Sequence, residues 1–140
     1  MTHNFPKIIH QIWFDFKDLP NIPEHFNKNV ESWKNHNPDW DYKVWDLETA
    51  VKIIKDEYPG YLNTFNEFKY NISKCDFFRY ILMNKYGGMY IDLDFLCIRP
   101  INYFLDLLEQ NSINKLNESV DTSIVLTEEW TNSSKKKNIN

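Results

Sequence analysis

One stretch constrains the fold more than any other, residues 73–94, which read SKCDFFRYILMNKYGGMYIDLD. Its apolar residues recur every three or four positions and predict a helix, with Ser73 as N-cap and Asp76 as the acidic partner of a capping box. The glycine pair at 87–88 is expected to end this helix, because glycine adopts left-handed conformations at little cost. A short buried strand at 89–91 should follow.

Two carboxylates close this stretch. Asp92 and Asp94 follow the expected strand, and because side chains alternate along a strand, both should point to the same side. Ligands of α/β sheets bind at the carboxyl ends of the strands. The pair therefore predicts a site for a divalent cation and its phosphate ligand, with a capped turn bearing two solvated carboxylates as the alternative.

Strand and helix patterns alternate along the whole chain. Strands are expected at 7–14, 41–45 and 122–127, with the central strand continuing at 95–98, and helices at 23–36, 47–57 and 101–109, with a polar loop at 110–121. This order predicts an α/β fold with a mostly parallel sheet flanked by helices. We expect one domain over residues 1–130 and a disordered tail over 131–140. His10, in mid-strand, is expected to be a core histidine, and Asp46 to be a helix cap.

Composition narrows the classes of function. A hydrophobic fraction of 42% predicts a folded core, and a net charge of −4 argues against general nucleic-acid binding. Cys75 and Cys97 lack a metal-binding spacing, so we expect two buried free thiols. No apolar segment is long enough to span a membrane and no signal peptide opens the chain, so a cytoplasmic or otherwise soluble, reducing location is expected.

Three motifs together resemble a known enzyme family. KIIHQIWF at 7–14, NPDWDYKVWD at 37–46 and SKCDFFRYILMNKYGGMYIDLDF at 73–95 resemble glycosyltransferases with a DxD motif and a sugar-binding region. The yeast-type initiating α-1,6-mannosyltransferases are similar, and large clostridial glucosylating toxins carry a similar core. The likeness covers about residues 6–105. A lone DxD would be weak, but Asp-x-x-Arg, Tyr-Gly-Gly and Asp-x-Asp in one helix–turn–strand unit are specific.

The resemblance implies a GT-A (Rossmann-like) fold, Mn²⁺ or Mg²⁺, and a UDP- or GDP-hexose donor. It also implies transfer to a glycan or protein acceptor with retention of anomeric configuration. By the same resemblance, Asp94 would coordinate the metal that bridges the donor phosphates, and Asp92 would contact it through water or bind the ribose. Trp13 would stack on the base, with core packing as the alternative. No catalytic base is recognisable, which suits a retaining transferase whose leaving phosphate can take the acceptor proton.

Two residues of the expected helix complete the candidate site. Asp76 and Arg79 lie three positions apart and share a helical face. The resemblance implies that both bind hydroxyls of the donor sugar, with Arg79 also near the phosphate, although a capping box and a local ion pair would explain them too. Arg79 is one of two arginines in the chain, and a lysine-rich chain can reserve arginine for planar, bidentate hydrogen bonding. Tyr90 shares the strand face of Asp92 and joins the candidates.

Other functions compete with sugar transfer. A phosphoryl-transfer enzyme with a nucleophilic aspartate would place its DxD on the first strand, whereas here it begins at residue 92. A catalytically weak remnant could instead bind nucleotide sugar, or a partner, without turnover. Because 46 residues follow Asp94, we expect the 140-residue chain to bind nucleoside diphosphate weakly and to transfer little sugar unless a second polypeptide completes it.

Overall fold

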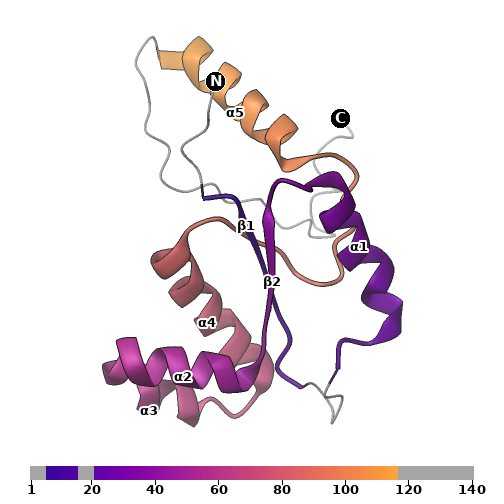
Figure 1. Cartoon of the computed structure of the whole chain (residues 1–140). Coiled ribbons are helices and arrows are strands. Elements are labelled where there is room, and N and C mark those ends of the chain that lie inside the picture. Colours follow the sequence, from indigo (N-terminus) through magenta and orange to yellow (C-terminus); the bar gives the residue numbers. More distant parts are fainter. Residues whose placement is uncertain (1–5, 16–20, 117–140) are drawn as a thin grey trace, which may run out of the picture. The chain divides into compact units, whose positions relative to one another are not determined.

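The computed structural model of the protein describes residues 6–15 and 21–116, shown as a ribbon in Figure 1. Its strands are β1 (Ile8–Ile12), β2 (Asp41–Trp45) and β3 (Met89–Tyr90), and its helices are α1 (Asn27–His36), α2 (Leu47–Glu57), α3 (Leu62–Glu67), α4 (Asn71–Tyr86) and α5 (Ile101–Leu116), with 3₁₀ turns η2 (Glu24–Phe26) and η3 (Pro59–Tyr61). The chain divides into two compact units after Leu105. The sheet and both clusters of core residues lie in the first unit.

The sheet is parallel throughout, in the order β2–β1–β3. Strand β1 pairs with β2 from Ile8 opposite Asp41 to Ile12 opposite Trp45, and with β3 at Ile9 opposite Met89. Strand β1 is therefore central, which explains why four of its five residues are buried, His10 and Gln11 included, because both faces of such a parallel strand are covered. The predicted α/β class with a parallel sheet flanked by helices is confirmed.

Helices cover the two faces of the sheet unequally. Figure 1 shows α2, α3 and α4 on one side of β1 and β2, and α1 on the other. On the first side, Ile12 and Trp45 join a cluster with Ala50, Ile54, Phe65, Phe78 and Leu82. On the second side, Ile9 packs with Trp40, Ile91 and Ile101. The alternation of β1 side chains thus divides the core into two layers.

His10 is fully buried at the centre of the sheet. Its Nδ1 lies 3.1 Å from the Trp45 Nε1–H and accepts that hydrogen bond, while its Nε2 lies 2.9 Å from the Gly87 carbonyl. These partners require a neutral ring with the proton on Nε2. Burial lowers the pKa of His10, which stabilises that neutral form. The expectation of a core histidine is confirmed.

Helix α2 begins where the sequence predicts. The backbone N–H of Thr49 donates to the Asp46 carboxylate at 2.7 Å, and this hydrogen bond lowers the pKa of Asp46. Helix α4, in contrast, begins at Asn71, so the prediction that Ser73 caps it, with Asp76 in a capping box, is wrong. The Asn71 side-chain amide donates to the carbonyl of Phe14, two residues after β1, and this contact holds the first turn of α4 earlier in the chain than the sequence pattern suggests.

The glycine pair ends α4 as predicted, and its geometry excludes other residues. Gly87 has φ 62° and ψ −149°, a conformation that is essentially restricted to glycine. Gly88 has φ 84°, and a Cβ atom there would lie 2.4 Å from the Ile8 carbonyl oxygen. The close approach of the chain to β1 at this point allows β3 to pair with the central strand.

The segment after the DxD motif differs from the prediction. Residues 95–98 are irregular rather than a strand, and they expose Phe95, Leu96 and Ile98 while burying Cys97. Helix α5 runs to Leu116, so residues 110–116 of the predicted polar loop are helical. The predicted strand at 122–127 and tail at 131–140 lie outside the described residues. Within 6–15 and 21–116, no helix has the length and apolar character needed to cross a bilayer.

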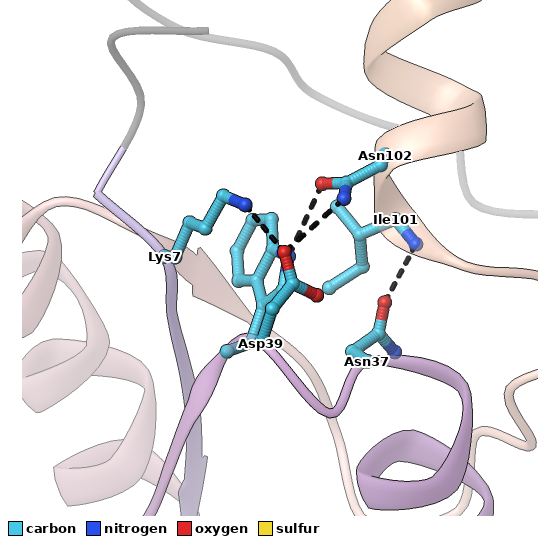
Figure 2. Close-up of polar contacts among 6 residues, drawn as sticks. Lys7, Asn37, Asp39, Ile101 and Asn102 are labelled. Atoms are coloured by element: carbon cyan, nitrogen blue, oxygen red, sulfur yellow. Dashed lines mark hydrogen bonds and ion pairs between the residues drawn. The ribbon is translucent and has the colours of Figure 1, made fainter. Parts of the chain in front are cut away.

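The turn between α1 and β2 is fixed by side-chain hydrogen bonds, and Figure 2 draws those of Asn37 with Ile101 and of Asp39 with Lys7 and Asn102. The buried Asn37 amide donates to the Trp33 carbonyl at 2.8 Å and accepts from the Ile101 N–H at 2.7 Å. The Asp39 carboxylate is paired with Lys7, whose hydrogen bond lowers the pKa of Asp39. Asn37 thus joins the last turn of α1 to the first residue of α5.

Candidate functional site

A pocket of about 290 Å³ opens at the carboxyl ends of β1 and β3. This is the edge at which parallel α/β sheets bind their ligands. Its lining includes five of the six site residues that the sequence predicts: Trp13, Arg79, Tyr90, Asp92 and Asp94. The sixth, Asp76, reaches the pocket through its contact with Arg79. Residues far apart in the sequence are thereby assembled around one hollow.

The two aspartates lie in a turn rather than on a strand. Strand β3 ends at Tyr90, and the Phe95 N–H donates to the Asp92 carbonyl at 3.2 Å, which closes the turn. The alternation argument for a shared side is therefore wrong, because a turn does not have the two-residue period. The turn nevertheless directs Asp92 and Asp94 into the lining of one pocket, and buries Leu93 between them.

Arg79 connects the acidic residues of the pocket. Its Nη2 donates to the Asp76 carboxylate, and its guanidinium lies 4.7 Å from the centre of the Tyr90 ring. The Tyr90 hydroxyl donates to Asp92 Oδ1 at 2.7 Å. Burial, with the Asp92 contact second, raises the pKa of Tyr90, so this hydroxyl keeps its proton and remains a donor.

One donor of Arg79 remains unused. Its Nε is buried and has no hydrogen-bond partner among the described residues. Leaving a buried donor unsatisfied costs about 1–3 kcal/mol. A ligand oxygen bound in the pocket could accept this hydrogen bond, so the arrangement favours an anionic or hydroxyl-bearing ligand.

The inner side of the pocket is apolar. Trp13 follows β1, and its ring meets Phe26 edge to face with centroids 6.2 Å apart. Cys75 lines the same pocket, and its burial raises the pKa of the thiol to about 12, which makes it a poor nucleophile at neutral pH. Cys75 and Cys97 are both buried and free, as predicted. An aromatic face beside charged groups suits a ligand with a planar base and a charged portion.

The aspartate turn is held by residues that are not among the site residues predicted from the sequence. Asn29 donates to the Leu93 carbonyl at 2.9 Å, and the Trp33 indole donates to the Phe95 carbonyl at 2.8 Å. Gln11 donates to the Asp92 carbonyl at 3.3 Å. One signal was available, since Asn29, Trp33 and Asn37 follow each other at four-residue spacing, which gives α1 a polar stripe beside its apolar one.

Two carboxylates alone do not make a closed metal site. Within 6–15 and 21–116, no three residues among His, Cys, Asp and Glu are grouped so that they could hold a metal ion. Mg²⁺, however, is usually bound by one or two carboxylates together with substrate phosphates. Asp92 and Asp94, beside the unused donor of Arg79, fit a divalent cation that is held jointly with a diphosphate.

Comparison with known proteins identifies a matching family. Residues 23–120 match the family described as "Glycosyltransferase sugar-binding region containing DXD motif". Mannosyl phosphorylinositol ceramide synthase SUR1 of Saccharomyces cerevisiae is 41% identical over 100 residues, which cover 71% of this chain and 25% of that protein. Inositol phosphoceramide mannosyltransferase 1 of Schizosaccharomyces pombe is 35% identical over 103 residues, covering 71% and 31%.

A less similar relative belongs to the group of mannosyltransferases that the motifs resemble. The initiation-specific alpha-1,6-mannosyltransferase of Candida albicans is 29% identical over 104 residues, which cover 72% of this chain and 27% of that protein. The chain thus spans about a quarter to a third of the length of these three relatives. No solved structure matches the chain.

Proposed function

The chain belongs to the family of glycosyltransferases with a DXD-containing sugar-binding region, as its motifs predicted, and from this premise we propose that its pocket binds a nucleotide sugar for hexose transfer. One observation supports this most directly. The DxD turn and Arg79 line the same pocket at the carboxyl edge of the sheet. Carboxylates for a cation and a guanidinium for phosphate or sugar oxygens are what a nucleotide-sugar donor requires.

The proposed division of roles follows the positions of the side chains. Asp94, with Asp92 beside it, holds Mn²⁺ or Mg²⁺ together with the donor diphosphate. The cation, when bound, offsets the negative charge that gathers on the departing diphosphate. Arg79 uses its free Nε on a donor oxygen, and Asp76 accepts a hydrogen bond from a sugar hydroxyl. Trp13 stacks on the base, which is uracil or guanine.

The relatives suggest which sugar and acceptor to test. Their names describe mannosyl transfer to inositol phosphoceramide and initiating α-1,6-mannosyl transfer. We therefore propose mannose as the hexose, and a hydroxyl of an inositol phospholipid headgroup or of a glycan as the acceptor. In a retaining reaction, the bond from the anomeric carbon to phosphate breaks, a bond to the acceptor oxygen forms, and the acceptor proton passes to the leaving diphosphate.

The first prediction tests the donor site. Purified protein should be stabilised in thermal-shift measurements by GDP or UDP with Mn²⁺, by about 2.7 kcal/mol at a ligand concentration of 100 Kd. EDTA should abolish the shift, and so should Asp94→Ala, without changing the melting temperature of the free protein, because an exposed carboxylate in a turn contributes little to folding.

Asp56→Ala is the matched control, because Asp56 is an exposed carboxylate on α2, away from the pocket. This variant should keep the full shift. Equal diphosphate affinity with and without EDTA would contradict the metal role. Adding a mannose nucleotide and an acceptor then separates the two candidate functions. Release of diphosphate that depends on the acceptor indicates transfer, whereas binding without release supports the nucleotide-sugar-binding alternative.

A further inference from the structure

Three side chains from distant parts of the sequence hydrogen-bond to the backbone of the aspartate turn. Gln11, Asn29 and Trp33 donate to the carbonyl groups of residues 92, 93 and 95, at 3.3, 2.9 and 2.8 Å. The donors come from β1 and α1, which are 62 to 81 positions away in the sequence. Besides the Phe95 N–H that closes it from within, the turn is therefore held by side chains from β1 and α1.

The first two of these contacts act on the peptide planes that connect the carboxylates. The Asp92 carbonyl belongs to the plane between residues 92 and 93, and the Leu93 carbonyl to the plane between 93 and 94. Each peptide unit is rigid. Fixing the direction of both carbonyl groups, with Leu93 buried between them, therefore fixes how the Cα–Cβ bonds of Asp92 and Asp94 are directed relative to each other.

Gln11 is itself oriented before it reaches the turn. Its side chain is fully buried, and the Tyr42 hydroxyl on β2 donates to its Oε1. This contact leaves the amide Nε2 to face the Asp92 carbonyl. Burial raises the pKa of Tyr42 to about 12, so its hydroxyl remains protonated and the amide cannot turn over without losing both hydrogen bonds.

We propose that Asn29 and Gln11 are positioning residues that hold the backbone of residues 92–94 so that both carboxylates can share one cation bound to a diphosphate. This inference rests on the proposed function. Neither side chain touches the ligand in this account. Residues that orient metal-binding groups from behind typically change metal affinity by tenfold or more when they are replaced.

The test compares two variants on the same face of α1. Asn29→Leu removes the hydrogen bond to the turn while keeping a similar volume. Ser32→Ala is the matched control, because Ser32 accepts from the Cys97 N–H at 2.9 Å, beyond the turn. Calorimetric titration of Mn²⁺ into protein in the presence of GDP or UDP, with the titration into diphosphate alone subtracted, should show roughly tenfold weaker metal affinity for Asn29→Leu, and less than a twofold change for Ser32→Ala.

Three further measurements test whether the effect is specific to the aspartate turn. Any diphosphate binding that remains in EDTA should be equally weak, within about twofold, in wild type and both variants, because a positioning role acts through the metal. Tyr42→Phe, which frees the Gln11 amide, should weaken Mn²⁺ affinity in the same direction by about threefold, the equivalent of part of one hydrogen bond. Amide exchange in the ligand-free protein should be faster at residues 92–95 in Asn29→Leu than in wild type.

The outcomes separate the inference from its premise. If wild-type protein binds Mn²⁺ with diphosphate and Asn29→Leu binds it equally well, the positioning role is wrong and the proposed function stands. If wild-type protein binds no Mn²⁺ with diphosphate, the proposed function is wrong and the positioning role is lost with it. Equal losses in Asn29→Leu and Ser32→Ala would also overturn the proposal, because they would indicate general destabilisation.

Discussion

Asp76 shows how a corrected helix boundary changes the interpretation of a residue. Once α4 is known to begin at Asn71, Asp76 lies inside the helix, and capping no longer explains it. Its contact is the ion pair with Arg79, whose guanidinium also stacks on Tyr90. The carboxylate side chain remains 57% exposed, so it is available to a ligand, and such a pair adds little to stability.

The second prediction follows from this position. Asp76→Asn should weaken binding of a nucleotide sugar by about tenfold, the equivalent of one charge-assisted hydrogen bond, while nucleoside diphosphate affinity changes less than twofold. Calorimetry with the two ligands measures the difference. Glu31→Gln is the matched control, since Glu31 forms the same kind of i,i+3 pair with Lys34 on α1. Similar losses for both ligands would show that Asp76 does not recognise the sugar.

The residues that line the pocket could be predicted from the sequence, whereas the residues that hold the aspartate turn in place could not. Trp13, Arg79 and the two aspartates belong to compact motifs, so a pattern could indicate them. Gln11 and Asn29 act through hydrogen bonds that span 81 and 64 positions. Periodicity reports only which face of an element is apolar, and it does not say which backbone carbonyl a polar side chain on that face will meet.

Side chains on or next to helix α1 supply hydrogen-bond partners for the backbone of residues 93–101, as a neighbouring strand would in a sheet. The side chains of α1 hydrogen-bond to backbone groups of Leu93, Phe95 and Cys97, and Asn37, directly after the helix, accepts from the Ile101 N–H. Buried backbone groups need partners, and these contacts supply them without a ladder. The apolar run at 95–98 suggested a strand because a local pattern does not show that side chains of α1 already pair with the backbone groups of this segment.

The third prediction concerns Asn37, which joins α1 to α5 (Figure 2). Asn37→Ala leaves the buried Ile101 N–H without its 2.7 Å acceptor, and should lower the free energy of unfolding by about 2 kcal/mol. Asn102→Ala is the control, because Asn102 makes comparable amide contacts nearer the surface, and should cost less than about 1 kcal/mol. Urea denaturation measures both. Equal effects would mean that Asn37 does not join the two helices.

For the whole molecule, the sequence predicted the layers but not the order of strands. Alternating strand and helix patterns were enough for a parallel α/β fold. The order β2–β1–β3 depends on pairing between β1 and β3. Strand β3 has only two residues, which is too short for a sequence pattern to indicate its partner. Its position is set by the glycine pair and by His10, which contacts β2 and the end of α4 at once.

The fourth prediction uses His10 to follow global stability. Burial lowers its pKa below the ordinary value of 6.5. As pH falls through 6.5, His10 binds a proton in the unfolded chain but not yet in the folded chain. The free energy of unfolding should therefore decrease until pH reaches the pKa of His10 in the folded state. Urea denaturation between pH 7.5 and 5, about the range of histidine titration, should show this decrease.

Two variants test whether the decrease in stability comes from His10. His36 is an exposed histidine, and His36→Gln should retain the decrease. His10→Gln should be less stable at pH 7.5, where the contacts of His10 are lost, but should show a flatter dependence on pH. A His10 ring that titrates near 6.5 in nuclear magnetic resonance spectra would contradict the prediction.

The central position of β1 also governs how the chain must be assembled. Both neighbours of β1 follow it in the chain, so during synthesis it emerges with both edges unpaired, and the edge at residue 9 stays unpaired until residue 89 has been made. Such non-local pairing raises contact order and slows folding. Because Trp13 follows β1 and the aspartates follow β3, the pocket forms only at this last closure. The nascent chain consequently carries an exposed apolar strand, a target for chaperones and for aggregation, until the site is complete.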